Sequence, residues 1–444
     1  MSGSRHKSMG YFKGSIWYFS LSLFILMFAL LIGPRVSDDH QIEQFVFNVH
    51  LTGPFGVSLN CDSPEFILLA ANPSHLLNRS NALQSRPGLI AAAAVLAWPF
   101  SSINGMLKNL SATAARSDYD QKRITDALSN DKPEYLAYIL LNIGFLLLAF
   151  YCLRHICLPW ADNNAITGII LAAIGFLLAA NDVVKAFVWS PHTQMFNILA
   201  PVFCLYASLR AKNGALLRRR FAISIGLLTG IGCTAYPLFV ILVPCVAICS
   251  LTYPFHQGCR TVWSQTIINT IIFMLFVFAP EALWIAFVFF KTGSFYQYQM
   301  ESFGVVIWMF QSESFGAFLT KWLENLKQLL WFAAVQAVPA VVLLVVVIAL
   351  NRRMDADKNR APLWPLVSTS TLVSAVTAVF YTSVGFLHPR LAYSIVAPFV
   401  VVVAAAAVAN GRSDFGRCRS IAYWSVSVAM ISAVYTVLKD GPYA

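Results

Sequence analysis

Long apolar runs separated by short polar segments dominate this chain. Eleven runs are long enough and poor enough in charge to cross a hydrocarbon layer as helices, which takes about 20 residues each. They lie at residues 16–32, 136–157, 164–181, 191–210, 219–236, 237–255, 264–290, 328–350, 363–385, 389–409 and 419–438. The pattern predicts an all-α polytopic membrane protein with one transmembrane domain over residues 1–444. Composition agrees, because 58% of the residues are hydrophobic and 11% are charged, against about 25% charged in a soluble domain.

Basic residues mark the short loops and set the predicted orientation. They precede the first run and fill four later loops: Arg5, Lys7, Lys13; Arg210, Lys212, Arg218, Arg219, Arg220; Arg260; Arg352, Arg353, Lys358, Arg360; and Arg412, Arg417, Arg419. Counting eleven crossings from a cytoplasmic N-terminus puts every one of these loops inside, as the positive-inside rule requires. The net charge of +11 is therefore a topology signal, and no nucleic-acid partner is expected.

Two longer polar segments fall on the outer side in this order. The first, residues 34–135, contains an apolar stretch within 88–107 that is only about 13 residues long before Ser101, a length typical of an interfacial or re-entrant helix. If this stretch crossed fully, every later basic loop would face outward. The second segment, 291–327, is aromatic and then amphipathic, and it is also expected to lie at the interface.

Adjacent carboxylates stand at the outer mouth of the first run. Asp38 and Asp39, followed by His40, come directly after Gly33-Pro34. Two neighbouring acids at a membrane edge repel one another and are costly to desolvate, so they often mark function. A solvated loop that ends the helix is the alternative interpretation.

These features together resemble the GT-C superfamily of integral-membrane glycosyltransferases, which includes protein mannosyltransferases and aminoarabinose transferases. The resemblance lies in the acids after the first span and in three short motifs: Ser85-Arg86-Pro87 before an apolar helix, Tyr135 to Asn142 at the start of the second span, and His388-Pro389-Arg390 before a late span. It implies transfer of a sugar from a polyprenyl-phosphate donor to a lipid, protein or glycan acceptor on the outer face. An extracytoplasmic active site in the inner (plasma) membrane of a bacterium, and a role in cell-envelope glycan biosynthesis, follow from the same resemblance.

The resemblance also implies site residues. Asp38 or Asp39 would be the catalytic base, because a carboxylate beside an acceptor hydroxyl can take its proton. Arg86 and Arg390 would hold the donor phosphate, since the planar guanidinium binds phosphate oxygens in pairs, and His388 would assist. For each arginine, snorkelling to lipid headgroups is the competing interpretation.

Weaker candidates lie near the third and fourth runs. Asp182 is placed to bind acceptor or metal, or to pair with Lys185 over one helical turn, and the pairing is preferred. His40 and His192 could join Asp38 and Asp39 in a divalent-metal site, the one cofactor considered. Glu281 lies within the outer part of its span, where an ionisable group is expensive, so a functional role or a lysine partner such as Lys291 is considered.

Two other functions fit the same architecture. A polymerase or ligase of lipid-linked polysaccharide would use outer-loop arginines, although such enzymes often carry their large loop late in the chain. A transporter or flippase for lipid-linked sugars would need charged groups at mid-membrane, whereas most of the candidates here gather at the outer surface.

Overall fold

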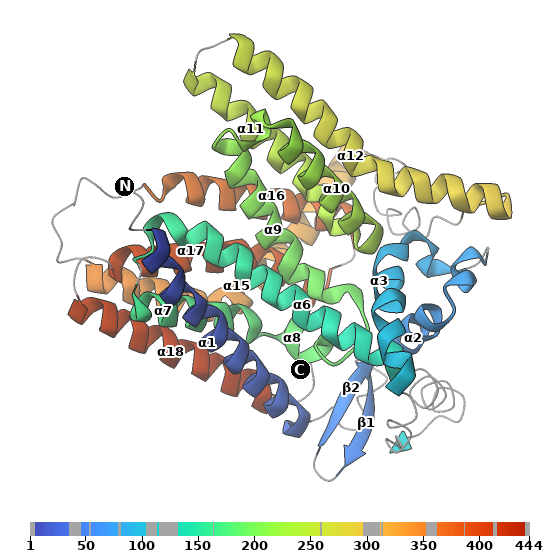
Figure 1. Ribbon diagram of the computed structural model, residues 1–444, viewed down its shortest axis with the longest axis horizontal. Coiled ribbons are helices and arrows are strands. Elements are labelled where there is room, and N and C mark those ends of the chain that lie inside the picture. Colours follow the sequence, from blue (N-terminus) through green and yellow to red (C-terminus); the bar gives the residue numbers. More distant parts are fainter. Residues whose placement is uncertain are drawn as a thin grey trace.

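The computed structural model describes residues 5–34, 46–52, 55–78, 81–103, 113–114, 132–162, 164–257, 260–295, 311, 314–351, 362–385, 387–411 and 415–439. Helices dominate this part of the chain (Figure 1). The longer ones are α1 (Arg5–Ile32), α6 (Lys132–Cys157), α7 (Ala165–Ala179), α9 (Phe196–Lys212), α10 (Arg219–Ala235), α11 (Leu242–Gln257), α12 (Arg260–Thr292), α15 (Phe315–Asn351), α16 (Trp364–Val384), α17 (Pro389–Gly411) and α18 (Phe415–Leu438).

Eight helices among the described residues are long and apolar enough to cross a membrane. They correspond to the predicted spans in α1, α6, α11 with the turn before it, α12, α15, α16, α17 and α18. The protein is therefore a polytopic helical membrane protein. The other three predicted spans form the shorter helices α7, α9 and α10, of 15, 17 and 17 residues, so the count of eleven crossings is not confirmed.

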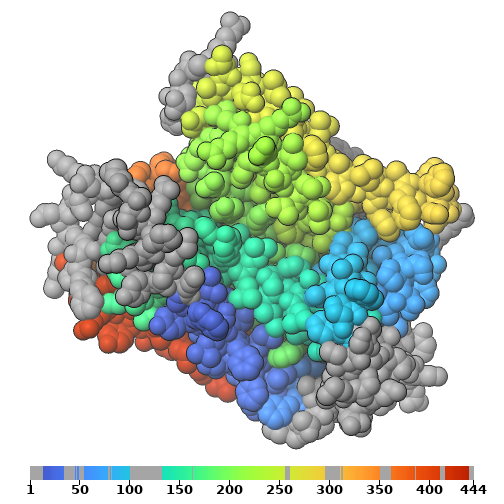
Figure 2. Space-filling model, in the orientation of Figure 1, coloured from blue at the N-terminus to red at the C-terminus, as the bar shows by residue number. Residues whose placement is uncertain are grey.

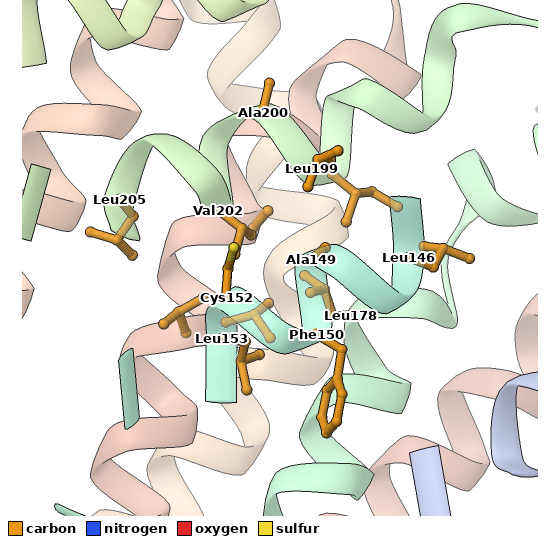
Figure 3. Packing of buried hydrophobic residues seen from close by; sticks show 14 of the residues in the cluster. Leu146, Ala149, Phe150, Cys152, Leu153, Leu178, Leu199, Ala200, Val202 and Leu205 are labelled. Atoms are coloured by element: carbon orange, nitrogen blue, oxygen red, sulfur yellow. The ribbon is translucent and has the colours of Figure 1, made fainter. Parts of the chain in front are cut away.

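Buried apolar side chains of α6, α7, α9 and α17 form a large part of the core. Leu146, Phe150 and Leu153 of α6 are buried near Leu199 of α9 (Figure 3), and the Phe150 ring stacks on Phe19 of α1 at a centroid distance of 4.2 Å. α17 is buried along most of its length, whereas α12 and α15 leave most of their side chains exposed. Exposed apolar side chains on these outer helices are what a lipid-facing surface requires.

Two glycines let α10 and α12 approach closely. A Cβ at Gly226 would lie 2.7 Å from the Phe273 carbonyl oxygen, and one at Gly230 would lie 2.5 Å from the Val277 carbonyl oxygen. Small residues four apart are the usual way for membrane helices to pack backbone against backbone. Near the crossing α12 contains Pro280, and the helix changes direction there (Figure 1), as expected for a proline inside a helix.

The first outer segment carries a small sheet that the sequence analysis did not predict. β1 (Val46–Thr52) pairs antiparallel with both β2 (Phe55–Asn60) and β3 (Thr113–Ala114), in the order β2-β1-β3. α2 (Ser63–Ala71) and α3 (Pro87–Ala97) follow β2 and lie beside the end of α12 (Figures 1 and 2). The Trp284 indole Nε1 of α12 donates to the Gln84 carbonyl, 2.7 Å away.

α3 and α15 form the helices in the two segments expected at the interface. α3 has 11 residues, about 17 Å of helix, which is shorter than a typical hydrocarbon core, and its interfacial position stays a prediction. The amphipathic stretch ending at Lys327 is different, because it forms the first turns of the continuous 37-residue helix α15. The helix therefore begins at Phe315, ahead of the span predicted from residue 328, and on the other side α12 continues to Thr292, while the extent of the outer segment stays a prediction.

Candidate functional site

An aspartate and a histidine from distant parts of the chain meet at one end of the helices. The Oδ2 atom of Asp62 lies 3.2 Å from Nε2 of His192. The Asp62 side chain is 65% exposed and the His192 side chain 5% exposed. The carboxylate is therefore open to solvent while the imidazole behind it is buried.

Asp62 holds the N-cap position of α2 without capping the helix through its side chain. Its own backbone N–H donates to Asn60 Oδ1 at 3.0 Å, and its carbonyl accepts from the backbone N–H groups of Glu65 and Phe66. An aspartate at this position usually bonds the first free N–H groups of its helix. Here the carboxylate is directed to His192 instead.

The segment that carries His192 is fixed by buried hydrogen bonds. Nδ2 of Asn142, in α6, lies 2.9 Å from the Phe187 carbonyl oxygen, 3.3 Å from that of Val188 and 3.1 Å from that of Ser190. The Ser190 hydroxyl lies 2.7 Å from that of Ser63 and accepts from the Asn60 N–H at 2.9 Å. The segments on either side of the Asp62–His192 contact are thus tied to one another.

His192 lies ahead of its helix, not within it. The sequence analysis started a span at residue 191, whereas α9 begins at Phe196 after a short turn over Thr193–Met195. The imidazole packs against the rings of Phe66 and Phe187, at centroid distances of 5.4 and 5.0 Å. Burial lowers the pKa of His192 and outweighs the opposite effect of the Asp62 carboxylate, so the ring is neutral at physiological pH.

Two predicted phosphate ligands, Arg86 and Arg390, act on this pair through their positive charge. Both contribute to lowering the pKa of Asp62, after the larger effect of the hydrogen bond from His192, and both lower that of His192. The Arg390 guanidinium lies over the Phe187 ring, 5.5 Å from its centroid. Arg86 precedes Pro87 of α3, and its Nε is buried without a hydrogen-bond partner among the described residues.

A buried polar network lies among the same group of elements. Oδ1 of Asn197 accepts from the hydroxyls of Tyr236, at 2.9 Å, and Tyr381, at 2.8 Å, while its Nδ2 donates to Gln194 Oε1 at 2.6 Å. The Tyr381 hydroxyl also lies 3.4 Å from that of Ser394. These bonds join α9, α16 and α17 to the end of α10 near both arginines.

His388 has a role that the sequence did not suggest. Its Nδ1 accepts the backbone N–H of Arg390 at 3.3 Å, at the start of α17. Burial, with a contribution from Arg390, lowers its pKa to about 4. The ring is therefore neutral at physiological pH and supplies no positive charge for a phosphate, although its assistance to the donor stays a prediction.

Asp182 is an ion-pair residue, but its partner is not the predicted one. Nζ of Lys439 lies 3.1 Å from Asp182 Oδ2, and Lys185 donates instead to the Lys439 carbonyl oxygen. The sequence analysis paired Asp182 with Lys185 because only a residue close in sequence is visible there. Asp182 therefore connects α8 (Asp182–Phe187) to the end of α18.

Asp38, Asp39 and His40, the predicted catalytic acids and their neighbour, lie outside the described residues. Among the residues that are described, no group of three or more histidine, cysteine, aspartate and glutamate side chains could hold a metal ion. The four-residue metal site considered from the sequence thus stays a prediction.

Asp62 is the functional candidate that the sequence analysis missed. The run Cys61-Asp62-Ser63-Pro64 has the pattern of a helix start, in which an aspartate precedes a proline in the first turn. A capping role would account for the residue without any function. The one signal of another role was its place in the same outer segment as Arg86.

No protein-family model, no curated protein and no solved structure matches this chain.

Proposed function

We propose that the protein is an integral-membrane glycosyltransferase that moves a sugar from a polyprenyl-phosphate donor to an acceptor at the extracytoplasmic face. The observation that carries the proposal is the Asp62–His192 contact, with Arg390 lying over the Phe187 ring that packs against His192. Arg86 acts on the same pair through its positive charge. Two guanidinium groups and an ionised carboxylate provide what this reaction needs: cations for the phosphate that leaves and an acceptor for a proton.

The arginines suit a lipid-linked phosphate better than a structural role. Arg86 has a buried Nε that no described residue accepts from, and a buried donor of this kind normally has a function or a ligand. The guanidinium group of Arg390 lies over the Phe187 ring, and this contact limits the movement of the guanidinium group. Both residues are followed or preceded by a proline that restricts the local backbone.

The position of the site also supports the proposal. In the predicted order of crossings, Asp62, Arg86, the segment before α9 and the start of α17 all belong to the outer side. A site at the outer ends of membrane helices is accessible both to a lipid in the outer leaflet and to a water-soluble acceptor. The eight apolar helices give the chain the surface that such a lipid donor requires.

Reconstituted protein tests the proposal. Purified protein in proteoliposomes would be given polyprenyl-phosphate-linked hexoses and pentoses with a membrane lipid and glycan extract as acceptor, and release of polyprenyl phosphate would be measured. Arg86→Gln and Arg390→Gln should each lower kcat/KM by about 10- to 100-fold, the value of a charge-assisted hydrogen bond. Arg220→Gln, at an exposed site at the start of α10, is the matched control. Release by none of the donors, or equal loss in all three variants, would overturn the proposal.

Glu281 favours a second candidate function. It lies inside α12, and its Oε2 is buried without a hydrogen-bond partner among the described residues. An ionisable group within a membrane helix is a typical feature of a transport pathway. Movement of a fluorescent polyprenyl-phosphate sugar across vesicle membranes without any transfer, and its loss in Glu281→Gln, would decide for a transporter.

A further inference from the structure

The contact between Asp62 and His192 has an unusual distribution of exposure. In most carboxylate–imidazole pairs of enzymes the histidine meets the substrate and a buried acid orients it. Here the carboxylate is 65% exposed and the imidazole 5% exposed. The group that can meet a substrate is therefore Asp62, and His192 is the group behind it.

The proton of His192 can be placed from its surroundings. A neutral imidazole carries a single N–H, and the ionised Asp62 carboxylate can only accept a hydrogen bond. Nε2, which lies 3.2 Å from Asp62 Oδ2, must therefore carry the proton. The other nitrogen, Nδ1, faces the Thr193 hydroxyl at 3.5 Å and is left to accept. This tautomer directs one N–H at one oxygen of Asp62.

The opposite arrangement, a surface ion pair, does not fit these surroundings. A protonated His192 would add a third positive charge to those of Arg86 and Arg390. It would do so between the apolar rings of Phe66 and Phe187, against which the imidazole packs. Within the described part of the chain, these arginines are the charged groups of neighbouring elements that act on both members of the pair. Asp62 thus stays ionised through a neutral donor and two nearby cations.

The pair is also held more firmly than a surface contact would be. Asn142 binds three carbonyl groups just before His192, and Ser63 and Asn60 bind Ser190. The Asp62 side chain is not engaged by its own helix. His192 fixes Oδ2, and the other oxygen, Oδ1, belongs to the same exposed carboxylate. A base that is positioned by one oxygen and meets its substrate with the other has this geometry.

We propose that Asp62, oriented by His192, is the base that receives the proton of the acceptor hydroxyl. The inference rests on the proposed sugar transfer and names its base. The acceptor oxygen forms a bond to the anomeric carbon, and the bond between that carbon and the phosphate oxygen breaks. Its electron pair stays on the phosphate, which Arg86 and Arg390 neutralise. The acceptor proton passes to Asp62 Oδ1 and from there to water. His192 is a positioning residue that keeps its own proton throughout.

Substitution of Asp62 is the first test, made in the full-length protein in proteoliposomes. Asp62→Asn keeps the shape and an oxygen for His192 but cannot take a proton, so kcat should fall by about 10²- to 10⁴-fold with little change in donor KM. Glu324→Gln, another exposed acid, should leave kcat within about 2-fold. If Asp62→Asn stays active while Asp38→Asn or Asp39→Asn is inactive, the inference is wrong and the transferase proposal stands. If the unsubstituted protein transfers no sugar, both fail.

Substitution of His192 separates positioning from simple packing. His192→Phe removes the hydrogen-bond donor to Asp62, so the Asp62 carboxylate becomes easier to protonate. The acidic limb of the pH–kcat profile should therefore shift to higher pH. His192→Gln keeps an N–H near the position of Nε2 and should restore the limb. A profile that is the same in all three proteins would overturn the positioning role.

Nitrogen NMR of labelled histidine provides a readout that needs no substrate. In nanodiscs, His192 should be a neutral Nε2–H tautomer at about pH 7.5, assigned by its loss in His192→Gln. An imidazolium signal at neutral pH would overturn the inference, whatever the activity.

Discussion

Lys439, just after the last helix, forms an ion pair with Asp182 at the start of α8, with 3.1 Å between Nζ and Oδ2. Their side chains are only 15% and 21% exposed, and the Lys439 carbonyl accepts from Lys185. The end of α18 is therefore held to the segment that leads toward His192. Breaking such a contact lowers the free energy of unfolding more than breaking a surface ion pair, because it leaves one partly buried charge without a partner.

Loss of that contact should lower stability. Lys439→Met leaves the Asp182 carboxylate partly buried and unpaired, so the free energy of unfolding should fall by about 1–3 kcal/mol. Thermal unfolding in detergent measures the change. Lys321→Met is the control, because the Lys321–Glu324 pair at 3.4 Å is 52% and 61% exposed and should contribute less than about 1 kcal/mol. Equal effects of the two substitutions would contradict the prediction.

The crossing of α10 and α12 should not tolerate a methyl group. Gly230→Ala would place Cβ 2.5 Å from the Val277 carbonyl oxygen and 2.8 Å from that of Phe276, so the helices must separate. We expect a loss of about 1–3 kcal/mol, seen as a lower midpoint of thermal unfolding. Gly144→Ala in α6 meets nothing within 4 Å and should be neutral or slightly stabilising. If both glycines behaved alike, close backbone packing would not be the reason.

Substitution of Asn142 should lower kcat by more than the loss of folded protein explains. Asn142→Leu has a similar volume but leaves the carbonyls of Phe187, Val188 and Ser190 without their shared donor. Unfolding free energy should fall by about 1–3 kcal/mol, and kcat should fall further than the lost folded fraction explains, because His192 loses its fixed position. Sugar transfer measured well below the unfolding midpoint checks this. A kcat that is unchanged there would show that the segment does not need the bonds.

His388 should make the protein less stable in acid. Its pKa is lowered from 6.5 to about 4 on folding, so the unfolded chain binds a proton that the folded chain does not. Stability is therefore complete above about pH 6.5 and is lost as the pH falls toward 4, by roughly 1–3 kcal/mol. The unfolding midpoint as a function of pH should decline less steeply in His388→Gln. His75→Gln, at an exposed position of the outer segment, should follow the unsubstituted protein.

The apolar runs predicted the helices well, because lipid-facing and buried side chains are both apolar and the runs are long. They predicted α7, α9 and α10 as longer than the helices of 15, 17 and 17 residues, since the sequence does not show where a helix gives way to a turn such as Thr193–Met195. The small sheet escaped because β1 and β2 are short and depend on tertiary pairing.

Prediction of the site was partial for a related reason. Arg86, Arg390 and His192 were chosen from the sequence, and both arginines act electrostatically on His192, while their roles in a site stay predictions. Asp62 was missed because its local pattern is that of a helix cap, and only a partner 130 residues away shows otherwise. For the same reason, the sequence did not indicate the ion pair of Asp182 with Lys439, which is 257 residues away. Pairing over such separations is fixed by the fold and leaves no local pattern.

The length of α15 has a practical consequence. Its 37 residues extend over about 56 Å, whereas the hydrocarbon core of a bilayer is about 30 Å thick. The polar residues near its start, Lys321 and Glu324 among them, indicate that the excess lies at that end. The start of α15 should therefore be accessible at the membrane or micelle surface. An antibody fragment raised against it would give electron microscopy a second fiducial, on the side of the outer sheet or opposite to it, for aligning particles.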